Sequence, residues 1–237
     1  MVTPVARRRR RIAGLRPFSP LRVPDCMLWI EADRGITTVD GLVSAWVDQS
    51  GNSRNLAQDN AANRPSYNTA PINDLPTVTF GEVVSTSCQL TLSAFAVPAT
   101  GFEFILVGRI TDVADTAMKI IASSSNTAYI ATGKIKLYAN ALTDAIWGSA
   151  VADPAVFSFR VAFDAAPWRR VNVNGGTAVT RNDGGATGGN FGTTFGSYGA
   201  NQLEMDVAAF LIYPLLTDAQ RLYLERGYGK KYNITVA

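Results

Sequence analysis

Val156-Phe-Ser-Phe-Arg-Val-Ala-Phe163 is the stretch that decides the fold of this chain. Every second residue from Phe157 to Phe163 is apolar, and Ser158 and Arg160 fall between them. Successive side chains of a strand point to opposite faces of its sheet, so a period of two is typical of a strand with one face against a core. The stretch therefore predicts a half-buried β-strand.

Four further stretches predict strands on either side of this one. They are Glu103–Arg109, where Phe104 and Leu106 lie on the face opposite Glu103 and Arg109; Lys134–Leu137; Arg170–Asn174; and the apolar run Val207–Tyr213. Asn174-Gly175-Gly176 closes the third, and Asn-Gly is a strong signal for a tight hairpin turn. Val207–Tyr213 is suited to a central strand because it has no polar face.

One segment predicts a helix. Thr217 and Gln220 have the spacing of a capping box, in which each side chain bonds the backbone N–H of the other residue. Leu222, Tyr223 and Leu224 follow with apolar contacts, and we expect Gly227 or Gly229 to end the helix by taking positive φ. Many short strands, many turns and one late helix predict an all-β fold, a sandwich or a barrel.

The chain divides into an arm and a body. The body, residues 26–237, has the length of one domain, and 47% of the 237 residues are hydrophobic, enough to bury a substantial core. Residues 1–25 contain four prolines, each of which discourages helix in the residue before it, so we expect an extended arm. We expect no secretion signal and no membrane span, because no apolar stretch is long enough for either.

The arm is strongly basic. Residues 1–22 contain no acidic residue and seven arginines: Arg7, Arg8, Arg9, Arg10, Arg11, Arg16 and Arg22. Subtracting these seven charges from the net charge of +3 leaves −4 for residues 23–237. Such a run could bind nucleic acid, dock on an acidic protein surface or act as a solvated tail. We favour protein docking, because the planar guanidinium pairs well with carboxylates and the body is acidic.

Six segments, taken in order, resemble the laminin-G-like branch of the concanavalin A-like lectin/glucanase superfamily. They are Leu28–Asp33; Val43–Asn52, with the branch's W-x-D-x-S-G-N pattern; Arg64–Tyr67; Pro76–Phe80; Arg170–Gly175, with its v-x-v-N-G hairpin; and Asp206–Tyr232. The resemblance spans residues 27–234 and implies a jelly roll of two packed antiparallel sheets. Domains of this kind occur in phage virion proteins, in bacterial surface proteins and beside glycosidases, so the fold alone does not assign a function.

We expect no enzymatic activity and no cofactor. The chain has no histidine, which removes the commonest general base and metal ligand. Glucanases on this fold carry Glu-x-Asp-x-(x)-Glu on one strand, and Glu31-Ala32-Asp33 supplies only its first half. Cys26 and Cys88, 62 positions apart, match no metal or redox spacing, and we expect both to be core residues.

Three sets of residues are candidates for ligand binding. In Trp46–Asn52 we expect a turn in which Asp48 or Ser50 bonds nearby amides and Gly51-Asn52 take positive φ, with a sugar or calcium contact from Asp48 and Asn52 as the alternative. Aromatic platforms for glycans would come from Trp147, Trp168, Tyr198 and Tyr129, although core positions are commoner for such residues. The weak calcium candidates are Asp112, Asp115, Asn182 and Asp183. Because Asp and Asn are common in loops for other reasons, we expect no metal site.

These features favour a virion structural protein, such as a phage capsid decoration protein or a head or tail fibre component assembled in the host cytoplasm. Its arm would dock on the major capsid protein or another virion protein, and host surface glycans would bind weakly. We expect no nucleic-acid partner, and by analogy with shell-mounted modules a trimer is the favoured homo-oligomer. The alternative is a carbohydrate-binding, lectin-like module of a cell-surface protein.

Overall fold

The computed structural model describes residues 17–81, 88–110, 118–122, 126–131, 134–139, 153–163, 169–181, 190–191, 193–198, 201–202 and 205–237. Its helices are α1 (Asp218–Tyr232) and two short 3-10 turns, η1 (Pro20–Arg22) and η2 (Ala61–Asn63). The strands are β1 (Leu28–Glu31), β2 (Ile36–Val39), β3 (Leu42–Trp46), β4 (Leu56–Ala57), β5 (Ser66–Ile72), β6 (Leu75–Phe80), β7 (Leu90–Thr91), β8 (Phe95–Ala96), β9 (Gly101–Ile110), β10 (Met118–Ala122), β11 (Asn126–Ala131), β12 (Lys134–Ala139), β13 (Ala155–Ala162), β14 (Arg169–Val173), β15 (Val179–Arg181), β16 (Asn190–Phe191), β17 (Thr194–Phe195), β18 (Ser197–Tyr198), β19 (Asn201–Gln202) and β20 (Met205–Pro214).

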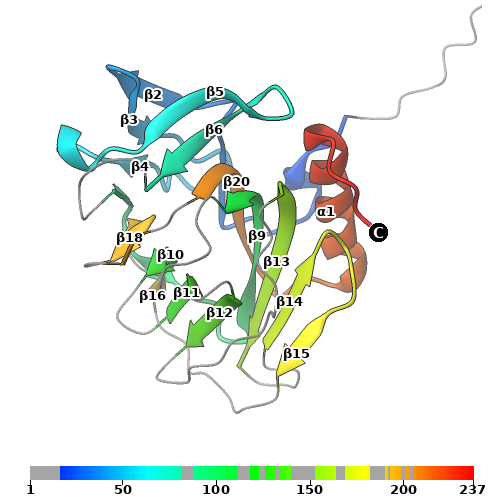
Figure 1. The fold of residues 1–237 in the computed structure, drawn as a ribbon. Helices are drawn as coiled ribbons and strands as arrows, with labels where there is room; N and C mark the ends of the chain where they lie inside the picture. The colour runs from blue at the N-terminus through cyan, green and yellow to red at the C-terminus, as the bar shows by residue number, and fades with distance from the viewer. Residues whose placement is uncertain are drawn as a thin grey trace, which may run out of the picture.

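The strands form a sandwich of two antiparallel layers (Figure 1). One layer has the order β5-β6-β20-β9-β13-β14-β15, with β1 also paired to β20. The other has the order β12-β11-β10-β17-β7-β4-β3, with β2 paired to β3. A single pairing, Leu42 with Ser66, carries the ladder from one layer to the other. The expected all-β sandwich with one C-terminal helix is confirmed, and β20 is central as predicted from its apolar run.

Aromatic side chains fill the space between the layers. Phe195 of β17 contacts Phe210 of β20 and Phe80 of β6, with ring centroids 5.0 and 5.5 Å apart. Trp46 of β3 meets the same Phe195 ring edge-on at 6.5 Å. All four side chains are fully buried. Residues from both layers therefore share one core, which is what a sandwich requires.

Helix α1 covers the outer face of β9 and β13 (Figure 1). A second apolar cluster lies between helix and sheet, and it includes Leu211, Tyr213, Leu224, Tyr228 and Tyr232. The period-two stretch around β13 predicted one buried and one solvated face. The structure shows both faces buried, because α1 lies over the face that carries Ser158.

Charged groups are buried under this helix. Glu225 is fully buried and accepts from Ser158 Oγ at 2.6 Å and from Arg221 Nη1 at 2.7 Å. Arg170 pairs with Glu103, which is also fully buried, at 3.1 Å, and with Asp218 at 2.7 Å. Burial raises the pKa of Glu103, although Arg170 opposes the shift. The polar face of the sheet is thus paired with the helix rather than with water.

The helix begins where the sequence predicts. Thr217 Oγ1 accepts from the backbone N–H of Gln220, and the Gln220 side chain accepts from the backbone N–H of Thr217, which completes the capping box. The predicted end is wrong. Helix α1 continues past both glycines to Tyr232, and Asn233 provides the left-handed cap with φ of 51°.

The two glycines serve close packing instead. A Cβ atom at Gly227 would lie 2.0 Å from the ring of Phe18, and one at Gly229 would lie 2.5 Å from a methyl group of Val236. Neither separation is sterically allowed, so the missing side chains let Phe18 and Val236 rest directly on the helix backbone. Glycine was needed here for space and not for its φ angle.

Other expectations from the sequence are met. Asn174 and Gly175 take φ of 50° and 70° in the hairpin between β14 and β15. Cys26 and Cys88 are free and buried, as expected of core residues. Among the residues that the structure describes, no helix combines the length and apolarity needed to cross a bilayer.

Candidate functional site

The Trp46–Asn52 segment forms a structural turn around Asp48. The Asp48 carboxylate accepts from the backbone N–H groups of Trp29 at 3.0 Å, Ser50 at 2.9 Å and Arg54 at 3.0 Å. It also accepts from Ser50 Oγ at 2.7 Å. Four donors leave Asp48 little capacity for a ligand. The expected turn is confirmed for Asp48.

The same turn holds the chain that leads into β1. Asn52 donates to the carbonyl of Cys26 at 2.8 Å, and Arg54 donates to the carbonyl of Met27. Positive φ occurs at Gly51, as expected, but at Ser53 rather than at Asn52. Asn52 therefore serves as a side-chain donor, not as a left-handed turn residue.

Most of the other candidates lie where the structure gives no side-chain description. Arg7 to Arg11, Arg16, Trp147, Trp168, Asp112, Asp115, Asn182 and Asp183 fall outside the described residues. Tyr129 is in β11 and Tyr198 in β18, and only their backbone is described. Arg22 is described; it lies in η1 and is exposed. Within the described ranges, no three Asp, Glu or Cys side chains gather as metal ligands would.

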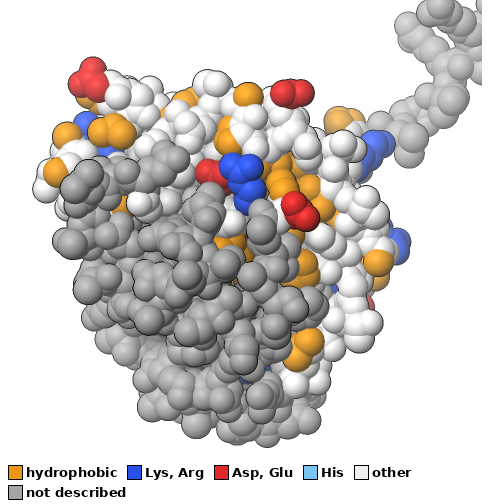
Figure 2. All heavy atoms as spheres, in the orientation of Figure 1, with side chains coloured by type: hydrophobic (Ala, Val, Ile, Leu, Met, Phe, Trp, Pro, Cys, Tyr) orange, Lys and Arg blue, Asp and Glu red, His pale blue; other side chains and the backbone are white. Residues whose placement is uncertain are grey.

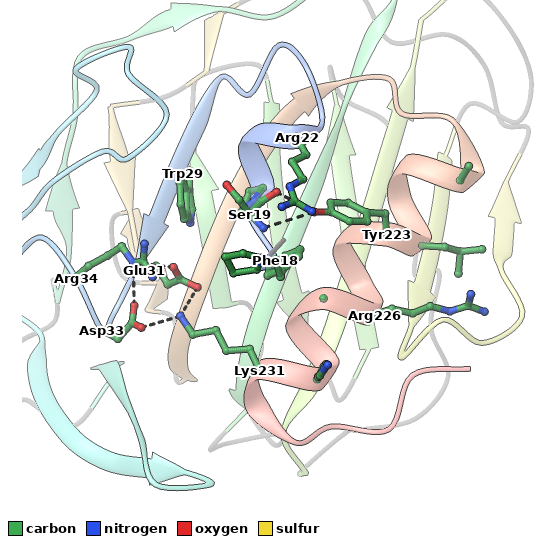
Figure 3. Close-up of a pocket in the computed structure, with 16 residues that line it drawn as sticks. Phe18, Ser19, Arg22, Trp29, Glu31, Asp33, Arg34, Tyr223, Arg226 and Lys231 are labelled. Carbon is green, nitrogen blue, oxygen red and sulfur yellow. Dashed lines mark hydrogen bonds and ion pairs between the residues drawn. The ribbon is translucent and has the colours of Figure 1, made fainter. Parts of the chain in front are cut away.

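A groove lies where the root of the arm meets the body (Figure 3). It has a volume of about 1180 Å³ and three walls: the segment 17–22, the end of β1 with the turn after it, and one face of α1. Its lining residues are Pro17, Phe18, Ser19, Pro20, Arg22, Trp29, Glu31, Asp33, Arg34, Ala219, Leu222, Tyr223, Arg226, Gly227, Lys230 and Lys231.

Residues 17–22 are fixed to helix α1 and to strand β20. Phe18 packs on Tyr223 and Tyr228, with ring centroids 5.5 and 5.0 Å apart. The backbone of Ser19 both donates to and accepts from Tyr223 Oη, at 3.5 and 3.2 Å. The Pro20 carbonyl accepts from Tyr213 Oη at 3.1 Å. This part of the expected arm is therefore a built wall of the groove.

The two acidic residues of the groove are already paired. Lys231 Nζ lies 2.8 Å from Glu31 and 2.7 Å from Asp33, and Arg34 Nε lies 3.0 and 3.2 Å from the same two carboxylates. Burial raises the pKa of Glu31, which is 2% exposed, against the effect of Lys231. Burial also acts on Asp33, but bonds and charges from Lys231 and Arg34 together lower its pKa.

The remaining charges of the groove are positive. Arg22, Arg226 and Lys230 are exposed, and none forms an ion pair with a described Asp or Glu side chain. On the face drawn in Figure 2, the charged side chains of the described residues are scattered and do not gather into a patch of one sign. Arg226 instead donates to the Ala237 main-chain oxygen at 3.3 and 3.4 Å, so within the described residues Arg22 and Lys230 are the groove cations left without a partner. Exposed cations around a concave surface attract an anionic ligand.

Trp29 forms part of the groove wall and keeps an unused donor. Its side chain is 6% exposed, and the Arg34 guanidinium lies 5.4 Å from the ring centroid. Its Nε1 has no acceptor within the described part of the chain. A buried N–H without an acceptor is costly, so an oxygen of a ligand would be a favourable partner if the wall opened slightly.

The sequence interpretation missed this groove. One signal in the sequence could have indicated the helix wall of the groove. The three- and four-residue spacing that places side chains on one helix face is shared by Leu222, Tyr223, Arg226 and Lys230. The other walls come from positions 17–34, about 200 residues away, and only the fold brings them together. Glu31 and Asp33 had been considered as half of a catalytic motif and not as ion-paired groove residues.

Comparisons with known proteins identify the fold. No family model and no curated protein matches the chain. Solved structures do match: the binding domain of Paraclostridial Mosquitocidal Protein 1 (11% identity, TM-score 0.57, covering 86% of this chain and 52% of that one) and the botulinum neurotoxin type G receptor-binding domain (12%, 0.54, 87% and 51%). A GH54 α-L-arabinofuranosidase also matches (13%, 0.55, 78% and 50%). The chain spans about half the length of these structures, and at such identities the likeness shows a shared sandwich fold.

Proposed function

We propose that this chain is a non-catalytic recognition module that binds an acidic protein surface in the groove at the root of its arm. One observation carries the proposal: Arg22, Arg226 and Lys230 are exposed around the groove, while Glu31 and Asp33 beside them are neutralised by Lys231 and Arg34. Of the three cations, Arg226 is bonded to the main-chain oxygen of Ala237, and Arg22 and Lys230 have no partner among the described residues. Complementary charge steers association and fixes the orientation of a partner. Six further arginines, within residues 7–16, precede Pro17 in the sequence.

The groove favours an acidic protein over a neutral sugar. Sugar rings stack on exposed aromatic faces, but only 6% of Trp29 is exposed and Arg34 lies over its ring. Tyr223 is half-buried, and its hydroxyl is bonded to Ser19. The cationic rim has no such obstruction, and arginine is well suited to carboxylates.

The same geometry disfavours catalysis at Glu31 and Asp33. Both carboxylates are held by Lys231 and Arg34, so neither is free to act as a nucleophile or to donate a proton. The likeness to toxin receptor-binding domains supports a binding role only through the fold, and a glycosidase shares that fold. A virion shell protein would be one acidic partner of suitable chemistry. None of the structures named above is a virion component, so that assignment rests on the arm alone.

Calorimetric titration of the full chain with an acidic peptide tests the proposal. The probe is a dodecapeptide of Glu and Asp with a central Leu-Phe pair. Arg22→Gln, Arg226→Gln and Lys230→Gln together should weaken binding about tenfold, because each exposed ion pair contributes roughly 0.5 kcal/mol. Added salt should weaken binding of the unmodified chain.

Arg64→Gln is the matched control. Arg64 bonds carbonyl oxygens of Gln58 and Asp59, away from the groove, so its loss should leave the affinity unchanged. Equal affinities of the triple variant and the unmodified chain would refute the groove as the binding site. A second series with Arg7 to Arg11 replaced by Gln measures what the arm adds.

A further inference from the structure

The groove has an apolar floor as well as a cationic rim. Phe18, Leu222 and Tyr223 line it and are each only half-buried, so a part of each hydrophobic surface remains in contact with water. Figure 3 shows Phe18 in the middle of the groove, between Trp29 on the β1 side and Tyr223 on the helix side. Charge attraction alone would not require this apolar surface.

The floor is held rigidly in place. Gly227 has no side chain, so the Phe18 ring rests against the helix backbone, and a Cβ atom there would come within 2.0 Å of the ring. Tyr228 packs edge-on against the same ring at 5.0 Å, and the two Ser19–Tyr223 bonds fix the chain beside it. A rigid, partly exposed aromatic surface loses little entropy when a partner covers it.

From these observations we infer that the groove selects a segment in which an apolar anchor residue is flanked by acidic residues. This inference rests on the function proposed above and specifies the chemistry of the partner. The anchor side chain would cover Phe18, Leu222 and Tyr223, and the flanking carboxylates would meet Arg22, Arg226 and Lys230. Interfaces commonly combine a buried apolar anchor with a charged rim in this way.

Trp29 provides an independent indication of a ligand oxygen at this site. It lines the groove, it is more than nine-tenths buried, and its Nε1–H lacks an acceptor among the described residues. A carbonyl or carboxylate oxygen of a bound peptide would satisfy that donor once a small movement of the groove wall exposed the buried Nε1 atom. An apolar ligand without oxygen would leave it unpaired.

Three dodecapeptides separate the contribution of the apolar anchor to the affinity from that of the acidic flanks. The first has Glu/Asp flanks and a central Leu-Phe pair, the second has the same flanks with a central Gly-Ser pair, and the third has the Leu-Phe pair between Lys flanks. Calorimetry with the full chain should show the first binding at least about tenfold more tightly than the second, because one buried apolar side chain supplies that much affinity. The first should also show the more negative heat-capacity change, which marks apolar burial.

A variant of the floor completes the test. Leu222→Ser should reduce the preference for the first peptide over the second, whereas Val39→Ser, an exposed apolar residue of β2 outside the groove, should leave it unchanged. Thermal unfolding verifies that both variants fold. Equal affinity for the first two peptides would overturn the anchor and leave the acidic-partner proposal standing. If neither acidic peptide binds, or if the Lys-flanked peptide binds as tightly as the first, the proposed function itself fails.

Discussion

The two faces of the layer that contains β9, β13 and β20 are both buried, but by different chemistry. The inner face meets the second layer through aromatic rings such as Phe210, which contacts Phe104 at 5.4 Å and Phe195 at 5.0 Å. The outer face meets α1 through tyrosines and through polar contacts such as Ser158 with Glu225 and Arg170 with Asp218. One alternating strand, β13, supplies phenylalanines to the first face and Ser158 to the second.

This difference shows that alternation identifies the two faces of a strand but not what covers the polar one. Ser158, Glu103 and Arg170 are the residue types expected next to water, and each is buried or nearly so under the helix. Their hydrogen bonds offset the cost of removing them from water, and the bonds also fix where the helix lies. Stability on the inner face comes from packed area, whereas on the outer face it depends on matched pairs.

The largest expected effect comes from disrupting the inner face. Phe210→Ala leaves a cavity between Phe104 and Phe195 and should lower the free energy of unfolding by about 3–5 kcal/mol. The midpoint of urea unfolding measures this loss. A loss below about 1 kcal/mol would mean that the two layers do not share this core.

A smaller effect is expected from breaking a pair on the outer face. Glu225→Gln keeps the shape of the side chain but removes the nearer charge partner of buried Arg221 and leaves it only Asp218 at 3.7 Å, which should cost about 2–3 kcal/mol. The double variant Arg221→Met with Glu225→Leu should recover part of that loss, because it removes the buried charge but leaves Ser158 Oγ without its acceptor. If the double variant is less stable than Glu225→Gln, the ion pair stabilises the fold by more than it costs to remove its two charges from water.

The smallest effect concerns the exposed end of the outer network. The hydrogen bond from Arg170 lowers the pKa of Asp218 from its ordinary value of 3.8. A lowered folded-state pKa gives stability that is present above pH 3.8 and is lost as the pH falls through the folded value. The Asp218 side chain is 71% exposed, so Asp218→Asn should cost under about 1 kcal/mol at pH 7. Urea midpoints of the variant and the unmodified chain should converge as the pH is lowered below 3.8, and a constant difference would contradict this assignment.

Much of the fold could be predicted from local patterns. Period-two stretches gave β13 and β14, the unbroken apolar run gave β20, and Thr217 with Gln220 gave the start of α1. The end of α1 could not be predicted, because the choice between a terminating and a packing glycine depends on Phe18, which lies about 200 residues away. The helix propensity of the local sequence gives no indication of a contact with a residue so far away in the chain.

The candidate site was less predictable. The sequence patterns favoured arginines and aromatic residues as site candidates, and of those whose side chains the structure describes only Arg22 lines the groove. The groove depends on long-range pairings, such as Lys231 with Glu31 and Asp33, that join residues from opposite ends of the chain. Whether a charged side chain is paired depends on its neighbours in three dimensions. The unpaired cation Lys230 could therefore be recognised only once Glu31 and Asp33 were seen to pair with Lys231 and Arg34.

The turn around Asp48 has a consequence for behaviour at high concentration. On the side of β1 away from β20, the Trp29 N–H is taken by Asp48, the Trp29 carbonyl by the Gln49 N–H, and the Glu31 carbonyl by the Trp46 indole. An open strand edge is a template on which a second molecule can add a strand and begin to aggregate. By occupying that edge with its own side chains and loop, the chain removes a route to intermolecular sheet growth beside the surface that we propose it uses for recognition.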